Sequence, residues 1–229
     1  MTQNLSKLTL IIPPLENGDK LTRSEFETRY EKMPHLKKAE LIEGIVYMGS
    51  PLRINQHGNP HIHLATWLGC YEAATPGVQA GDNCTVRLDS ENEPQPDALL
   101  RIKKGGKSTI SEDDYIEGAP ELIVEIAAST ASIDLHDKLK VYRRNQVQEY
   151  LIWRVYDDEF DWFRLKEGKY IKLQPNPTGI IKSEIYPGLW LDINALLQRN
   201  LAKVLAVLQQ GVATEEHQIF INKLSEIPQ

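Results

Sequence analysis

The sequence contains little cysteine and no long apolar stretch. Only two of its 229 residues are cysteine, Cys70 and Cys84, which is too few for a disulfide scaffold and does not give the paired spacing of a zinc finger. We therefore expect reduced thiols and a cytoplasmic protein. No run approaches the roughly 18 apolar residues that cross a membrane. Residues 1–14 also lack the apolar core and cleavage site of a signal peptide.

The chain has no excess of positive charge either. Its formal net charge is −6 and its pI is near 5.6, so no overall field would attract nucleic acid. A nucleic-acid role would depend on a local basic surface or on bound cations. No glycine-rich nucleotide loop, Gly-x-Ser-x-Gly elbow or paired CxxC motif occurs, which gives little support to NTP hydrolysis, a serine hydrolase or a zinc ribbon.

The composition and the hydrophobic periodicity favour one soluble globular domain. Thr22 and Glu25 match a capping box for a helix that ends near Glu31. The remaining periodicity predicts a hairpin over 39–48, helices over 55–74, 133–144 and 192–210, strands over 78–88, 96–102, 122–128, 149–155, 160–165 and 170–173, and a polar loop over 103–118. This order is typical of an α/β fold with a central mixed β-sheet flanked by helices and followed by a C-terminal helix.

Glu125 stands out because it is a carboxylate inside an apolar run. Residues 122–128 read Leu-Ile-Val-Glu-Ile-Ala-Ala, which is typical of a buried strand. An ionised carboxylate without a partner there would be strongly destabilising or would stay protonated. We therefore expect a metal ion, a basic side chain or backbone donors beside it. The downstream candidates are Asp134, Asp137, Lys138 and Lys140.

A second acid and a lysine are well placed to join Glu125. Asp97 opens an earlier predicted strand, and pairing of the two strands would bring both carboxylates to one cation. Two oxygen ligands completed by water suit Mg²⁺ or Mn²⁺. Asp134, Lys138 and Tyr142 share a face of the next helix because they are four residues apart. A metal beside a lysine lowers the pKa of a bound water and stabilises charge on a phosphate, which suits phosphodiester hydrolysis.

These residues belong to a wider ordered pattern. It consists of Glu40-Leu41-Ile42-Glu43-Gly44, His57, Pro96-Asp97, Pro120 to Ile126, Asp134 with Lys138 and Tyr142, Glu149 to Trp153, and Pro187-Gly188-Leu189. In order and spacing, these motifs resemble the Uma2 family of restriction-endonuclease-like proteins. The arrangement is also similar to the PD-(D/E)xK nuclease motif, with the lysine moved from the position of Ala127 to the next helix.

The resemblance implies a restriction-endonuclease-like domain over 21–197, between an N-terminal extension (1–20) and a C-terminal helix and tail (198–229). It implies an endonuclease that uses Mg²⁺ or Mn²⁺ to hydrolyse DNA. Asp97 and Glu125 would be metal ligands, Lys138 the charge-stabilising residue, and Glu40 a further acid at the metal. Glu43 is the weaker candidate because it faces away from Glu40 on a strand. A homodimer is expected, since two sites would cut two strands.

Two positions depart from the family pattern. Ala128-Ser129-Thr130-Ala131 replaces the usual Ser-Pro-Ser-Thr, which changes the path from Glu125 to Lys138. Gln146-Val147 replaces the usual Gly-Val, which affects only a turn.

Other interpretations remain open. His57, His61 and His63 suggest a zinc hydrolase by their density, although Pro60 and the spacing disfavour one shared face. His57 could instead border the carboxylate site. A second alternative is a catalytically silent nucleic-acid-binding or interaction module of the same fold. The basic residues near the site could touch phosphates or face solvent; they are Lys103, Lys104, Lys107, Lys140, Arg143 and Arg144.

Overall fold

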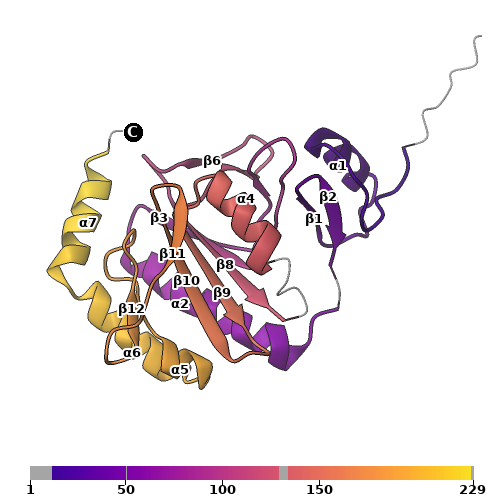
Figure 1. Ribbon diagram of the computed structural model, residues 1–229. Helices are drawn as coiled ribbons and strands as arrows, with labels where there is room; N and C mark the ends of the chain where they lie inside the picture. The colour runs from indigo at the N-terminus through magenta and orange to yellow at the C-terminus, as the bar shows by residue number, and fades with distance from the viewer. Residues whose placement is uncertain (1–11, 50, 129–133, 228–229) are drawn as a thin grey trace, which may run out of the picture.

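A mixed six-stranded sheet forms the centre of the protein (Figure 1). The computed structural model describes residues 12–49, 51–128 and 134–227. The strand order is β11 (Lys169–Lys172), β10 (Glu159–Lys166), β9 (Glu149–Arg154), β8 (Leu122–Ala127), β5 (Ala98–Ile102) and β3 (Val78–Asp82). Only β8 and β9 are parallel; the other neighbours in this sheet pair antiparallel. The predicted α/β fold with a mixed sheet and the predicted meander over 149–173 are therefore confirmed.

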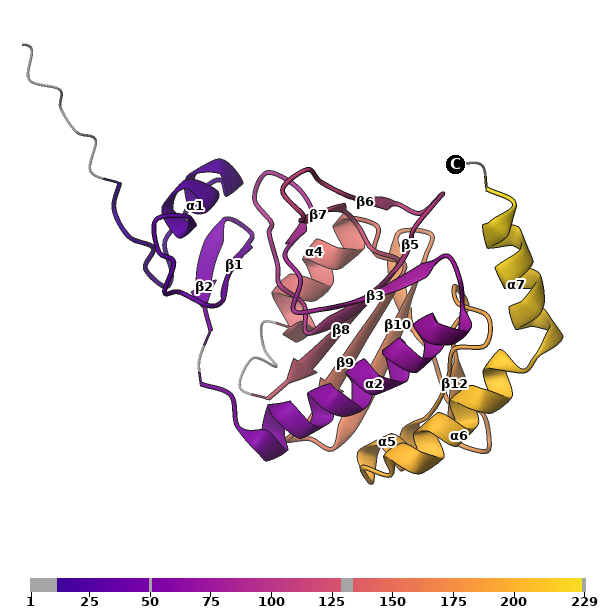
Figure 2. The same cartoon turned by 180° about the vertical axis from the view of Figure 1, so that it is seen from behind.

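Helices cover both faces of this sheet (Figures 1 and 2). Helix α2 (Asn59–Ala74) lies on one face and α4 (Leu139–Arg144) on the other. Successive strand residues point to opposite faces, so Leu122, Val124 and Ile126 share a core cluster with α2. Ile123 and Ala127 instead pack with Tyr142 of α4. Glu125 has the same parity as Ile123 and therefore belongs to the α4 face.

Each of these helices is preceded by a turn of π-helix. η1 (Ile54–Gly58) leads into α2, and η2 (Asp134–Lys138) leads into α4. The helices predicted over 55–74 and 133–144 are present, although Ile133 and most of the departure at 128–131 lie outside the described residues. The π-helical turn places Asp134 and Lys138 immediately before α4, where both are buried.

The strand predicted over 78–88 is interrupted. Asn83 adopts a positive φ of 49°, a conformation that breaks a strand, so β3 ends at Asp82 and β4 (Val86–Arg87) joins a different sheet. That sheet has the order β4-β7-β6, with β6 (Ser108–Ile110) and β7 (Ile116–Gly118). The prediction of a loop over 103–118 was therefore wrong. These strands are three residues long and too polar to show a hydrophobic alternation.

Residues 15–48 form what we call the N-terminal unit, which lies beside α4 (Figures 1 and 2). It contains α1 (Arg23–Tyr30) and the hairpin of β1 (Ala39–Ile42) and β2 (Ile45–Met48). The capping box is confirmed, since the Thr22 side chain and the Glu25 carboxylate bond each other's backbone N–H groups. Leu41 of β1 bonds Glu93 through both backbone groups, at 3.1 and 2.8 Å. This bridge connects the hairpin to the segment that leads into β5.

The C-terminal part packs against the α2 face. It comprises β12 (Ile180–Lys182), β13 (Trp190–Asp192), α5 (Ile193–Leu197), α6 (Leu201–Val212) and α7 (Glu215–Ser225). The single helix predicted over 192–210 is divided at Arg199, whose φ is 57°, and α7 was not predicted. Val204 and Leu208 of α6 enter the same core cluster as α2. None of the helices that the structure describes is long and apolar enough to cross a membrane.

Candidate active site

The strand register brings Asp97 and Glu125 to one place. Ala98 pairs with Val124 and Leu99 with Ile123, so the next pair in this antiparallel register is Asp97 with Glu125. Both side chains lie on the α4 face because residues opposite each other in a sheet point to the same side. They are only 4% and 3% exposed, respectively. The pairing predicted from sequence is therefore present, with both carboxylates buried.

Lys138 and Tyr142 compensate the charge of Glu125. Lys138 Nζ donates to Glu125 Oε1 at 2.9 Å, and the Tyr142 hydroxyl donates to the same oxygen at 2.8 Å. Lys138 ends η2 and Tyr142 lies one turn later in α4, so the spacing of four residues aims both groups at the sheet. Of the partners expected for Glu125, the basic side chain is the one observed. Asp137 and Lys140 instead pair with each other at 3.5 Å in an exposed position.

Lys138 contacts two further acids. Its Nζ lies 2.9 Å from Glu40 Oε1 and 3.6 Å from Asp134 Oδ1. Burial opposes the charge of Lys138, but the surrounding carboxylates, led by Glu125 and Glu40, hold its pKa well above the usual value. The lysine is therefore a buried ammonium ion. It joins the N-terminal unit, which supplies Glu40, to the central sheet.

Asp97 has a different set of partners. His57 Nε2 lies 3.1 Å from Asp97 Oδ1, and the backbone N–H of Ile126 donates to Asp97 Oδ2 at 2.8 Å. Lys38 Nζ lies 3.5 Å from Asp97 Oδ1. Burial alone would raise the pKa of Asp97, but the hydrogen bond from His57 and the charge of Lys38 hold it well below the usual range. Asp97 is therefore a carboxylate that stays ionised.

Glu125 is in the opposite electrostatic situation. Burial raises the pKa of Glu125, and although Lys138 counteracts that rise, the charges of Asp134, Asp97 and Glu40 add to it. Negative charge at this point is thus only partly balanced by the side chains around it. A further positive charge near Glu125 and Asp97 would favour the ionised form of both.

The two glutamates of the hairpin have different surroundings, as the strand alternation predicts. Glu40 points inward, where its Oε1 accepts from the backbone N–H of Gln95 at 2.8 Å and contacts Lys138. Glu43 lies at the hairpin turn and pairs with exposed Arg144 at 2.8 Å. Glu43 and Gly44 both have positive φ, which is the conformation of a two-residue hairpin turn.

Lys38 was not predicted to be part of the site. Its side chain is 29% exposed, whereas that of Lys138 is 5% exposed. The signal was present in the sequence: Lys38 and Glu40 are two residues apart at the start of a strand, so both point to the same side. A lysine two residues from an acid of the site, on the same strand, is therefore a candidate for the same site.

The histidines do not share one centre. His57 contacts Asp97, while His61 Nε2 lies 2.7 Å from Asp82 Oδ1 and 2.8 Å from the backbone oxygen of Asp97. His63 lies 3.4 Å from the Asn59 amide, and burial lowers its pKa. The three imidazoles thus have three sets of partners, which argues against the zinc alternative. The predicted position of His57 at the border of the carboxylate site is observed.

The basic residues after Asp97 lie far from the site. Lys103 follows the last residue of β5, and six residues of strand at about 3.3 Å each place it about 20 Å from Asp97. Of the two roles left open for Lys103, Lys104 and Lys107, this distance favours the one in which they face solvent, away from the carboxylates. Asp97 precedes the first residue of β5, whereas Lys103 follows its last residue.

Asp97 and Glu125 fit a divalent cation through the chemistry of their oxygens. Mg²⁺ prefers hard oxygen ligands, keeps several waters and binds through one or two carboxylates. The excess negative charge around Glu125 also favours such an ion. Lys138 contacts Glu40 as well as Glu125, so Glu40 already has a positively charged partner. Within the parts of the chain that the structure describes, no three His, Cys, Asp or Glu side chains are grouped to hold a metal together. The fit is thus to two protein ligands.

Comparison with known proteins gives the family of this chain. No curated protein matches its sequence. A solved structure, described as "a putative nuclease belonging to DUF820 from Anabaena variabilis ATCC 29413", superimposes with a TM-score of 0.56 at 13% sequence identity, covering 75% of this chain and 97% of that one. This likeness shows a shared fold. The sequence model of the Uma2 family, described as "Putative restriction endonuclease", matches residues 24–194, which include all four predicted site residues. Because that match extends over most of the chain, from α1 to the start of α5, this protein belongs to the Uma2 family.

Proposed function

We propose that this protein is a divalent-metal-dependent endonuclease that hydrolyses phosphodiester bonds in DNA. The observation that carries the proposal is the pairing of Asp97 and Glu125 on one buried face, with Lys138 Nζ 2.9 Å from Glu125. Two carboxylates beside an ammonium group can bind a hard cation next to a phosphate. The description of the Uma2 family model, "Putative restriction endonuclease", supports the same reaction class.

Each residue of the cluster has a distinct proposed task. Asp97 and Glu125 would hold Mg²⁺ or Mn²⁺, with Glu40 as a further acid near the ion. When bound, the ion would lower the pKa of a water and stabilise charge that develops on the phosphate. Lys138 holds Glu125 and Glu40 at fixed positions and counteracts the rise of the Glu125 pKa. Tyr142 fixes the orientation of Glu125 through its 2.8 Å hydrogen bond.

His57 and Lys38 act on Asp97. The hydrogen bond at 3.1 Å from His57 Nε2 orients the Asp97 carboxylate, provided that Nε2 carries the proton. Lys38 is the more exposed of the two lysines and is held at the site by a 3.5 Å ion pair and a 3.4 Å contact with Asn83. Its long side chain can leave Asp97 and reach a phosphate that arrives at the cluster. We assign it to substrate binding.

A homodimer fits this function. Restriction of double-stranded DNA needs one cut in each strand, and a two-fold axis would present one site to each. We therefore propose that the active species contains two copies of the chain.

One observation favours a second candidate. Lys138 is itself the counter-ion of Glu125 and Glu40 at 2.9 Å each, so the cluster can be stable as a structural ion-pair network. In that case the protein would be a catalytically silent nucleic-acid-binding module of the same fold. It would bind DNA in Mg²⁺ or Mn²⁺ and leave it uncut.

Plasmid cleavage distinguishes the two candidates. The wild type is expected to convert supercoiled plasmid to nicked and linear forms in Mg²⁺ or Mn²⁺. EDTA, which removes the cation, should stop this cleavage. Asp97→Asn and Glu125→Gln should abolish cleavage, and Lys38→Ala should slow it. Asp137→Asn is the matched control, because Asp137 is an acid next to Lys138 whose one ion pair within the described residues is with exposed Lys140. Equal nicking by all variants would refute the site, and DNA binding without any nicking would favour the silent module.

A further inference from the structure

A cavity lies outside the carboxylate cluster. It has a volume of about 200 Å³ and lies between the N-terminal unit and the three-stranded sheet. Its lining comes from α1 and the turn that follows it, from β4, and from Glu93 and Tyr115. None of Asp97, Glu125 or Lys138 contributes to it. The proposed nuclease site therefore does not account for this cavity.

The polar side of the cavity contains a buried carboxylate with an unused oxygen. Glu93 is 4% exposed, and its Oε2 makes no hydrogen bond within the described residues. The Arg87 Nε atom lies 3.9 Å from this oxygen, which is beyond hydrogen-bond range. A buried carboxylate oxygen without a hydrogen bond is costly. A proton shared with the neighbouring Glu27, or a donor that enters the cavity, would satisfy it.

Arg87 is already engaged by other groups. Its guanidinium lies 2.8 Å from Glu27, 2.9 Å from Asp113 and 3.2 Å from Glu117. It also lies over the ring of Tyr115, 4.3 Å from the centroid. Burial, together with the neighbouring Glu27, raises the pKa of Glu93 to about 8, although Arg87 lowers it. Arg87 thus faces four acids, Glu27, Glu93, Asp113 and Glu117, and a second positive charge beside Glu93 would favour the ionised form of its carboxyl group, so the cavity suits a cation better than an anion.

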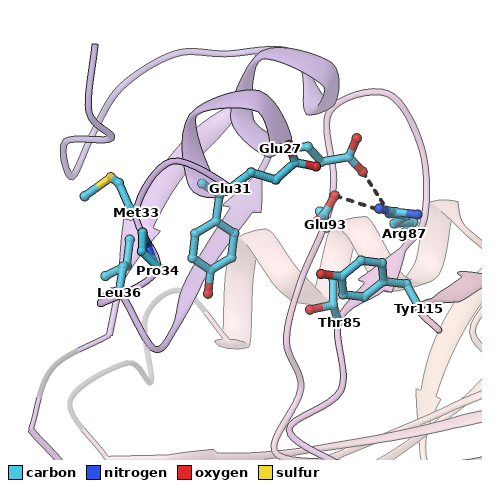
Figure 3. A pocket seen from close by; sticks show the side chains of 10 residues that line it. Glu27, Glu31, Met33, Pro34, Leu36, Thr85, Arg87, Glu93 and Tyr115 are labelled. Atoms are coloured by element: carbon cyan, nitrogen blue, oxygen red, sulfur yellow. Dashed lines mark ion pairs between the residues drawn. The ribbon is translucent and has the colours of Figure 1, made fainter. Parts of the chain in front are cut away.

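The other side of the cavity is apolar. Figure 3 shows Met33, Pro34 and Leu36 on the side opposite Arg87 and Tyr115. A fully hydrated inorganic ion would gain nothing from these side chains. A cation attached to a short hydrocarbon chain would place its charge at the carboxylates and its chain against the apolar side.

We infer that this cavity binds a primary ammonium group carried on a short aliphatic chain. The ammonium donates to Glu93 Oε2 and lies near Glu27, and the chain packs on Met33 and Leu36. Glu31, which is exposed at the edge of the cavity, adds attraction for the incoming cation. The same chemistry is offered by a free alkylamine and by a lysine side chain of a peptide.

Calorimetric titration of the full-length protein with n-butylammonium chloride tests this inference, with 1-butanol as the neutral probe of the same shape. We expect saturable one-to-one binding of the ammonium and none of the alcohol. Glu93→Gln, which keeps the shape of the protonated acid, should weaken binding at least about tenfold, since a charge-assisted hydrogen bond is lost. Glu216→Gln, an exposed acid on α7, should leave the affinity unchanged.

Further probes define the ligand class. Methylammonium should bind more weakly than butylammonium, because it lacks the chain that packs on Met33. Tighter binding of Nα-acetyl-lysine N-methylamide than of butylammonium would identify a peptide lysine as the ligand, and weaker binding a free amine. Exposed Glu31→Gln serves as a second variant whose fold is not at risk, and it should also reduce affinity. No saturable binding of any amine, or equal binding by wild type and both cavity variants, would overturn the inference.

Discussion

At the scale of the single residue, Lys138 determines whether the carboxylate cluster is stable. Its ammonium lies 2.9 Å from both Glu40 and Glu125 and is almost completely buried. Removing one partner of such a network leaves charges without compensation in a medium that solvates them poorly. The same side chain therefore supports both the fold and the proposed chemistry.

We predict that Lys138→Met lowers the free energy of unfolding by about 3 to 5 kcal/mol, the usual cost of breaking a buried ion pair from one side. Lys140→Met is the control, because that lysine is exposed and, in the part of the chain that the structure describes, forms an ion pair with Asp137 alone; its change should stay within about 0.5 kcal/mol. Urea denaturation measures both. Adding Glu125→Gln to Lys138→Met should recover part of the loss. Equal effects of the two lysine substitutions would contradict the role of Lys138.

Glu149 is a second buried acid, and it should make stability depend on pH. Its carboxylate accepts from Ser183 Oγ at 2.7 Å and from the backbone N–H of Glu184 at 2.8 Å. Burial outweighs these bonds and raises the pKa of Glu149 to about 7, against an ordinary value of 4.5. Because the folded state holds the proton more tightly, this group stabilises the fold below pH 4.5 and loses that contribution as pH rises through 7.

The difference in unfolding free energy between wild type and Glu149→Gln isolates this effect. From pH 4.5 to 8 the wild type should lose up to about 3 kcal/mol relative to the variant. Guanidinium denaturation at several pH values gives the difference, in which the titration of the other groups cancels. A difference that stays constant over this range would show that Glu149 is not protonated in the folded protein near neutral pH.

At the scale of the element, sequence patterns predicted the central sheet well. The run around Glu125 is a buried strand, and the apolar alternation of residues 149–173 is a meander. These elements are predictable because their stability comes from apolar burial, which leaves a pattern in the sequence. Strands β6 and β7 leave no such pattern. Their pairing depends on contacts with other elements, such as the pairing of β7 with β4 (Val86 with Ile116) and the hydrogen bonds of buried Arg101 of β5 to Ser108.

The candidate site was predictable to a similar extent. The acid in an apolar strand, the Pro-Asp pair and the helical spacing of Asp134, Lys138 and Tyr142 are local signals. His57 was also expected at the border of the site, but the contact of Lys38 with Asp97 was not, because it joins the N-terminal unit to the sheet across 59 positions of sequence (97 − 38 = 59). The cavity beside Glu93 also depends on tertiary packing, since its two sides come from different units of the fold.

Substitution of two glycines in these elements should change the stability of the protein in opposite directions. Gly118 ends β7 with a φ of +86°, and a Cβ there would lie 2.7 Å from the backbone oxygen of Lys107. Gly118→Ala should therefore destabilise the protein by about 1 to 3 kcal/mol. Gly69 lies inside α2, where a Cβ meets nothing within 4 Å, so Gly69→Ala should stabilise it by about 0.5 to 1 kcal/mol. Thermal unfolding measures both changes. Shifts of the melting temperature in the same direction would contradict these opposite roles of Gly118 and Gly69.

At the scale of the whole molecule, the N-terminal unit and the central sheet together complete the site. Glu40 and Lys38 come from the unit, and Asp97 and Glu125 come from the sheet. A movement of the unit relative to the sheet would therefore separate the acids that we assign to the cluster. The proposed dimer adds a second requirement, since it presents one such site to each strand.

We predict a dimer in solution that cuts both strands of DNA in one encounter. Light scattering should give twice the 26.1 kDa mass of the chain. Linear plasmid should then form together with the nicked form rather than long after it. A monomer at the concentrations used for cleavage, with nicked plasmid as the only early product, would contradict the proposed dimer and leave the carboxylate site untouched.

In the proposed active site, Asp97 and Glu125 hold a divalent cation. Anomalous diffraction from crystals soaked in MnCl₂ tests it most directly, because the peak locates the ion without reference to activity. We predict one peak between these two carboxylates, within about 2.5 Å of an oxygen of each, and its loss in Asp97→Asn. A peak at His57, His61 and His63, or no peak beside Asp97 and Glu125 at saturating Mn²⁺, would contradict the account.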